Sequence, residues 1–168
     1  MMWSKLRKEI RELITSELRQ RIDIHCTCYH DAHDNYGEVW ITLDGKKLFG
    51  GGHYYWYRIF QSSQEILSYD FALQHGGHQE FSKPKVESRE VETLMRLGFN
   101  ETGQITNSLE NYINTPYEES LNSNNPIYKA FALVDKRLGK RRFLRIDITN
   151  EKHPLVKLFY KLRKECFK

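Results

Sequence analysis

The stretch VWITLDGKKLF, residues 39–49, carries the clearest fold signal in the chain. Apolar side chains recur at every second position from Val39 to Leu43, as in a half-buried strand. Asp44-Gly45 then gives a strong two-residue hairpin signal, and residues 46–49 are the return strand. The glycines at 50–52 are expected to break the strand pattern. This stretch therefore predicts an antiparallel hairpin.

The same alternation occurs earlier in the chain, at residues 22–29. Cys26 and Cys28 fall on the apolar face of that strand, where cysteine behaves as a small hydrophobe, and His25 points the other way. Together with the hairpin, this strand predicts a three-stranded antiparallel meander.

An amphipathic helix is predicted over residues 3–21, before the sheet. Its apolar residues recur at helical spacing with Lys, Arg and Glu between them. They are Trp3, Leu6, Ile10, Leu13, Ile14 and Leu18.

The middle of the chain predicts a helix at 53–67, a loop at 75–86 and a helix at 87–97. A further helix is expected at 106–114. Thr115 is expected to cap the next one, with Pro116 at its first position.

Two later helices have their own start signals. Asn125-Pro126 opens a helix that Gly139 is expected to end, and Pro154 opens the last helix. Between them, residues 142–148 alternate as a strand does. The prediction is a single α+β domain over residues 1–168: a meander packed with an N-terminal helix and a C-terminal group of short helices.

Composition narrows the class of protein. The apolar share of 39% and the charged share of 29% are those of a globular protein. No window reaches the ~18 apolar residues of a membrane span, and the charged N-terminus is unlike a signal peptide. The three cysteines are expected to be free thiols in a reducing compartment. We therefore expect a cytoplasmic protein that does not contact a membrane.

Five motifs resemble those of a family of small, uncharacterised bacterial cytoplasmic proteins. They are WSKL at 3–6, ITLDGK at 41–46, EESL at 118–121, ALVDKRLGKRR at 132–142 and HPLVKLFYKLR at 153–163. The resemblance implies one domain in a bacterial cytoplasm. It carries over no catalytic role.

Charge is divided unevenly along the chain. Residues 129–168 hold 13 Lys and Arg against 4 Asp and Glu, a net +9, so the remainder carries −5 of the total +4. Such a division favours an acidic partner for the C-terminal part.

Basic residues in that part are candidates for binding nucleic acid, because together they could neutralise several phosphates. The alternatives are a solvated helix face and an acidic protein partner. The candidates are Lys136, Arg137, Lys140, Arg141, Arg142, Arg145, Lys157, Lys161 and Lys164.

An aromatic run, Tyr54, Tyr55, Trp56 and Tyr57, is the candidate for binding a protein. Consecutive aromatics cannot all face inward, and Tyr and Trp dominate interface hot spots. The alternative is ordinary core packing with hydroxyls reaching water.

His30, His33 and Asp34 are the candidates for catalysis, as the centre of a hydrolase or nuclease. The second pair of ligands that a zinc site needs is missing, so no metal and no cofactor is expected. Phosphate-loop, serine-hydrolase and dinucleotide motifs are absent from the sequence.

These observations lead to a binding protein rather than an enzyme. An unidentified protein partner is the first expectation, and nucleic acid bound by the basic C-terminal segment is the alternative. A hydrolase or nuclease centred on His30 and His33 comes third.

Overall fold

The computed structural model describes residues 2–27, 38–52 and 102–168. The N-terminal part holds α1 (Trp3–Leu13), α2 (Ser16–Arg19) and three strands. The strands are β1 (Ile22–Cys26), β2 (Glu38–Leu43) and β3 (Lys46–Gly52). Their order in the sheet is β1-β2-β3, and both pairs are antiparallel. The predicted α+β meander is therefore confirmed.

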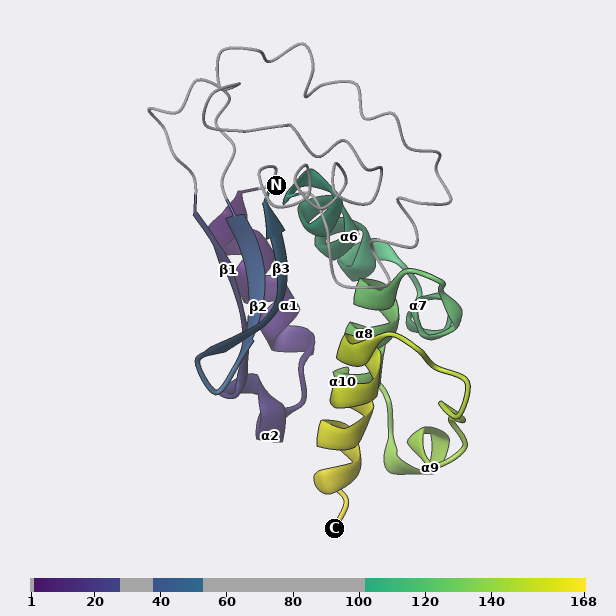
Figure 1. Cartoon of the computed structure of the whole chain (residues 1–168). Coiled ribbons are helices and arrows are strands. Elements are labelled where there is room, and N and C mark those ends of the chain that lie inside the picture. Colours follow the sequence, from purple (N-terminus) through teal and green to yellow (C-terminus); the bar gives the residue numbers. More distant parts are fainter. Residues whose placement is uncertain (1, 28–37, 53–101) are drawn as a thin grey trace, which may run out of the picture.

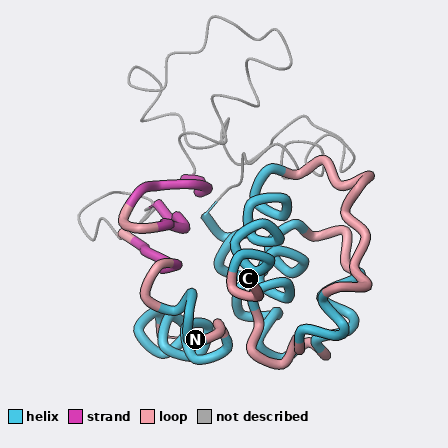
Figure 2. The backbone as a smooth tube through the Cα atoms, turned by 90° about the horizontal axis from the view of Figure 1, so that it is seen from below, coloured by secondary structure: helices cyan, strands magenta, loops and turns pink. Residues whose placement is uncertain are grey.

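The C-terminal part is helical. It contains α6 (Thr102–Asn114), α7 (Tyr117–Asn122), α8 (Pro126–Val134), α9 (Lys140–Phe143) and α10 (Pro154–Glu165). Figure 1 shows the sheet and α1 on one side of the molecule and α6, α8 and α10 on the other, and Figure 2 shows the same division from below. Helix α6 contacts α1, β2 and β3, so it joins the two sides.

One hydrophobic core runs through both sides. Ile22 and Ile24 of β1 and Val39 and Ile41 of β2 are completely buried, as the period-two pattern predicts. The core continues through Phe131 of α8 and into α10. Among the described residues, no helix has the length and apolar character needed to cross a membrane.

The turn at Asp44-Gly45 forms as predicted. Both residues have positive φ, 50° and 77°, which suits the twist of a two-residue hairpin. The prediction that the glycines at 50–52 end the strand is wrong, because β3 continues through Gly52. Gly50 lies opposite Trp40, and a Cβ there would come within 2.5 Å of the Trp40 Cβ. Glycine thus permits close strand pairing here.

The prediction of a single N-terminal helix over residues 3–21 is wrong in one respect. The chain leaves the helical conformation at Ile14, where ψ is 140°, and resumes a short helix at Ser16. Ile14 forms an isolated antiparallel bridge with Asp135, far away in sequence. A long-range backbone pairing therefore replaces one turn of helix.

The strand predicted at 142–148 is also wrong. Residues 140–143 form α9, and Leu144, which should face the core of such a strand, is 61% exposed. Phe143 is buried instead, and its ring stacks on Tyr160 with the centroids 4.7 Å apart. Packing of this one aromatic onto α10 thus decides the local conformation.

Helix starts were predicted with mixed success. Asn125 caps α8 by accepting from the backbone N–H of Ile127, and Pro154 opens α10 as expected. Thr115 does not cap α7, because its hydroxyl donates to the carbonyl of Asn111 and α7 begins only at Tyr117.

The end predicted for α8 is wrong as well. The helix stops at Val134 because Asp135 is extended, so Gly139 instead precedes α9. The predicted elements at 53–67, 75–86 and 87–97 lie outside the described residues.

Candidate nucleic-acid interface

A buried carboxylate organises the start of the basic segment. The side chain of Asp135 has no exposed surface and accepts a hydrogen bond of 2.6 Å from the Tyr112 hydroxyl. It also accepts from the backbone N–H of Arg137 at 2.7 Å and from the Arg137 guanidinium. The hydrogen bond to Asp135 raises the pKa of Arg137. The chain direction after α8 is fixed by this cluster.

The same region joins the two sides of the molecule. The Thr15 N–H donates to the Val134 carbonyl at 3.0 Å, and the Lys136 N–H donates to the Leu13 carbonyl at 2.8 Å. We call this junction the elbow. It holds the end of α1 against the start of the basic segment.

Helix α9 is anchored to α10 by aromatic contacts. Phe143 lies between Tyr160 and Phe167, with ring centroids 4.7 and 5.2 Å away. Arg141 and Arg145, two positions before and after Phe143 in the sequence, are exposed. The contacts of Phe143 thus fix the position of α9, while the side chains of Arg141 and Arg145 are exposed to solvent.

Three of the predicted basic residues have structural partners. Arg137 is paired with Asp135, and Arg142 donates to Glu118 at 3.1 Å. Lys140 donates to the backbone carbonyl of Phe167 at 3.2 Å. Because these three cations already have partners, they should contribute less binding energy to a ligand than unpaired cations would.

The other six predicted basic residues are exposed. None of them makes an ion pair with another residue in 2–27, 38–52 or 102–168. We call this set the basic face. It comprises Lys136, Arg141, Arg145, Lys157, Lys161 and Lys164.

Half of the basic face is a stripe along α10. Lys157, Lys161 and Lys164 are exposed, whereas Phe159 and Leu162 are buried. A rise of 1.5 Å per residue spreads the three ammonium-bearing positions over about 10 Å of helix axis. The stacking of Phe143 on Tyr160 places α9 beside this stripe. Arg141 of α9 therefore lies on an element next to the stripe.

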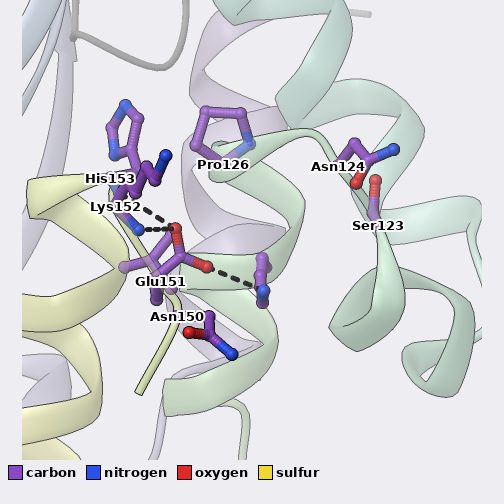
Figure 3. Close-up of a pocket in the computed structure, with 9 residues that line it drawn as sticks. Ser123, Asn124, Pro126, Asn150, Glu151, Lys152 and His153 are labelled. Carbon is purple, nitrogen blue, oxygen red and sulfur yellow. Dashed lines mark hydrogen bonds and ion pairs between the residues drawn. The ribbon is translucent and has the colours of Figure 1, made fainter. Parts of the chain in front are cut away.

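A cavity of about 270 Å³ lies at the start of α8 and α10 (Figure 3). The Lys129 ammonium and the Glu151 carboxylate are 2.7 Å apart, and Glu151 also accepts from the backbone N–H groups of Lys152 and His153. The buried His153 ring accepts from the Leu155 N–H through Nδ1. The cavity is lined by Ser123, Asn124, Pro126, Lys129, Asn150, Glu151, Lys152, His153 and Val156. The ion pair of Lys129 with Glu151 and the hydrogen bonds to Glu151 thus hold the segment that leads into α10.

We expect low pH to weaken the interactions of Glu151 with Lys129 and with the backbone before α10. Burial by itself raises the pKa of Glu151, but the hydrogen bonds from Lys129 and the backbone outweigh it and lower that pKa. A carboxylate with a lowered folded-state pKa stabilises the fold above its unfolded pKa of about 4.3, and this stability is lost as the pH falls through the folded value. We expect Glu151→Gln to cost about 1 kcal/mol of unfolding free energy at neutral pH, and nothing at about pH 2. Urea denaturation at several pH values measures this, and a cost that persists in acid would contradict it.

The remaining sequence candidates are largely outside the described residues. His30, His33 and Asp34, and the run Tyr54–Tyr57, belong to this group. Cys26 packs against the core as predicted, and the His25 ring stacks on Trp40. Within the described ranges, no three His, Cys, Asp or Glu side chains are grouped so as to hold a metal ion.

Two groups of residues near the basic segment and α1 were not predicted from the sequence. One is Asp135 with Tyr112, which sets the path of the basic segment. The only sequence signal for it is a single acid directly after the apolar stretch FALV of α8. The other is a groove along α1, lined by Trp3 and several arginines.

Comparisons with known proteins place the chain in a family. No curated protein and no solved structure matched it. A family model matches residues 2–164, which is nearly the whole chain, and the family is uncharacterised, as the sequence motifs implied. The chain belongs to the SF0329 protein family.

Proposed function

We propose that this chain is a nucleic-acid-binding protein that contacts phosphates through the basic face. The observation that carries the proposal is the set of six exposed cations whose side chains make neither an ion pair nor a hydrogen bond with any described residue. Cations that already have a carboxylate partner gain little from a phosphate, whereas these six can replace condensed counterions directly.

The arrangement of the stripe supports a polyanion. Helix α10 carries four Lys and Arg, and its single acid, Glu165, is its last residue. Regular cations on a straight helix match a ligand with regularly repeated negative charge. Phosphate contacts of this kind position a nucleic acid without reading its sequence.

A protein partner, which was the first expectation from the sequence, is the second proposal. The division of charge also suits an acidic protein, but the run Tyr54–Tyr57 that motivated it lies outside the described residues. The hydrolase centred on His30 and His33 rests on residues that also lie outside them. A cytoplasmic location in a bacterium is part of the proposal, supported by the family resemblance and by cysteines expected to stay reduced.

Fluorescence anisotropy with labelled single-stranded RNA, single-stranded DNA and duplex DNA tests the proposal. Arg141→Glu/Arg145→Glu should weaken binding at least about tenfold, because two phosphate contacts become repulsive. Both side chains are exposed and unpaired with other described residues, so the fold should survive.

Lys5→Glu/Lys46→Glu is the matched control. It makes the same change in net charge at two exposed lysines outside the basic face, and its affinity should stay within about threefold of wild type. Equal losses in the two variants would show that only total charge matters. No binding by wild type at low salt would move the search to an acidic protein partner, with Trp56→Ala and Tyr57→Ala as the next variants.

A further inference from the structure

A second cationic surface lies on the N-terminal helices. A groove of about 430 Å³ runs along α1 and reaches α2. We call it the Trp3 groove. It is lined by Trp3, Ser4, Arg7, Lys8, Arg11, Glu12 and Arg19.

The groove has more positive charge than its acids neutralise. The Asp23 carboxylate is shared by two arginines, accepting from Arg7 Nε at 2.9 Å and from Arg11 Nη1 at 2.8 Å. One carboxylate between two guanidinium groups leaves one positive charge over. Both arginines remain partly accessible, with 41% and 27% of their side-chain surface exposed.

Arg19 adds a charge that forms no ion pair with a carboxylate of the described residues. Its Nη2 donates to the backbone carbonyls of Glu12 and Ile14, which are neutral groups at the end of α1. Its Nε is buried and has no hydrogen-bond partner among the described residues. Lys8 and Glu12 are 3.9 Å apart and well exposed, a pair of little strength. An anion entering the groove would therefore meet uncompensated guanidinium groups.

Trp3 supplies a flat apolar surface at one end. Its side chain is half-buried and packs against the core, which fixes the indole, while it also lines the groove. Nucleic-acid bases stack on such aromatic side chains whatever their identity. A base can do so only when it is not stacked and paired within a duplex.

The elbow connects this groove to the basic face. Lys136 belongs to the basic face, and its N–H is bonded to the carbonyl of Leu13, which follows Arg11 and Glu12 of the groove. The second elbow bond, from Thr15 to Val134, keeps the two segments in register. The groove and the start of the basic segment are therefore joined at the elbow.

We infer that the Trp3 groove takes an unpaired nucleotide, with its base on the Trp3 indole and its phosphate on the arginines, so that the protein prefers single-stranded over duplex nucleic acid. The inference rests on the proposed function and deepens it by naming the class of nucleic acid. The basic face alone has no means to distinguish one strand from two.

Anisotropy titrations with oligo-U, oligo-dT and a duplex of equal length test it. Wild type should bind both single strands about tenfold or more tightly than the duplex. The ratio between oligo-U and oligo-dT shows whether RNA or DNA is the better ligand. Trp3→Leu keeps an apolar side chain against the core and removes the indole, so it should weaken single-strand binding about tenfold and leave duplex binding unchanged.

Lys8→Glu and Lys5→Glu form a matched pair that does not depend on the core. Each lysine is exposed and lies within 4 Å of a glutamate one turn ahead, but only Lys8 lines the groove. Lys8→Glu should lower single-strand affinity several-fold more than Lys5→Glu does.

Equal effects of Lys8→Glu and Lys5→Glu, or equal losses of single-strand and duplex binding in Trp3→Leu, would overturn the inference. If these occurred while Arg141→Glu/Arg145→Glu still weakened binding, the proposed function would stand without the groove. Absence of any wild-type binding at low salt would overturn both.

Discussion

Asp135→Ala should lower the free energy of unfolding by about 3–5 kcal/mol, because it removes the centre of a buried polar cluster. The variant leaves the Tyr112 hydroxyl and the Arg137 backbone N–H without an acceptor. Because the Asp135 side chain is fully buried, water does not readily replace the acceptor that the variant removes. Each such orphaned group costs about 1–3 kcal/mol. The Arg137 guanidinium loses its ionic partner as well. Urea denaturation followed by circular dichroism measures the change.

Asp147→Ala is the control for this prediction. Asp147 also accepts from a backbone N–H two residues ahead, that of Thr149, but it lies on the surface. Water replaces the lost bonds there, so a cost of about 1 kcal/mol or less is expected. If the two alanine variants lost the same stability, Asp135 would not organise the elbow as described.

Lys157→Glu/Lys161→Glu/Lys164→Glu should reduce nucleic-acid affinity about a hundredfold or more at low salt. The three side chains belong to one exposed stripe, so their reversal turns half of the basic face from attraction to repulsion. The buried face of α10, with Phe159 and Leu162, is untouched, and the melting temperature should change little.

The corresponding glutamine variant separates lost contacts from added repulsion. Neutralising three phosphate contacts should reduce the slope of log affinity against log salt by about 2 to 3. A glutamate variant that binds as tightly as Lys5→Glu/Lys46→Glu would show that the stripe is only a solvated face of α10.

Local signals predicted much of this fold. The Asp44-Gly45 turn and the helix starts at Asn125-Pro126 and Pro154 depend on the φ values and capping groups of one or two residues. The buried faces of β1 and β2 follow from period-two alternation, which any half-buried sheet requires. These parts could be predicted because neighbouring residues decide them.

The elements that were predicted wrongly depend on contacts between residues far apart in the sequence. Ile14 leaves its helix because its backbone pairs with Asp135, more than a hundred positions away in the chain. Residues 142–148 alternate like a strand, yet the Phe143 ring packs against Tyr160 of α10 and against Phe167, which follows that helix. Gly50 looks like a strand breaker until Trp40 is placed opposite it. Periodicity within a short window carries none of this information.

The residues of the candidate site were likewise predicted only in part from the sequence. Composition identified the basic C-terminal segment, and the side chains of six of its nine candidates make neither an ion pair nor a hydrogen bond in the described part of the chain. Which three are engaged depended on Asp135, Glu118 and the Phe167 carbonyl, whose positions only the fold gives. The Trp3 groove was missed because its charges come from two helices separated by the elbow.

The salt dependence of wild-type binding to a single-stranded oligonucleotide tests the central claim most directly. Six cations on the basic face, each releasing about 0.7 counterion from a single strand, predict that log affinity falls linearly with log salt with a slope of about −4, and a steeper one where the Trp3 groove adds a phosphate contact. Binding of this kind should be tight at low salt and weak near physiological salt. No binding at the lowest salt, or a slope close to zero, would contradict the claim that the basic face binds phosphates.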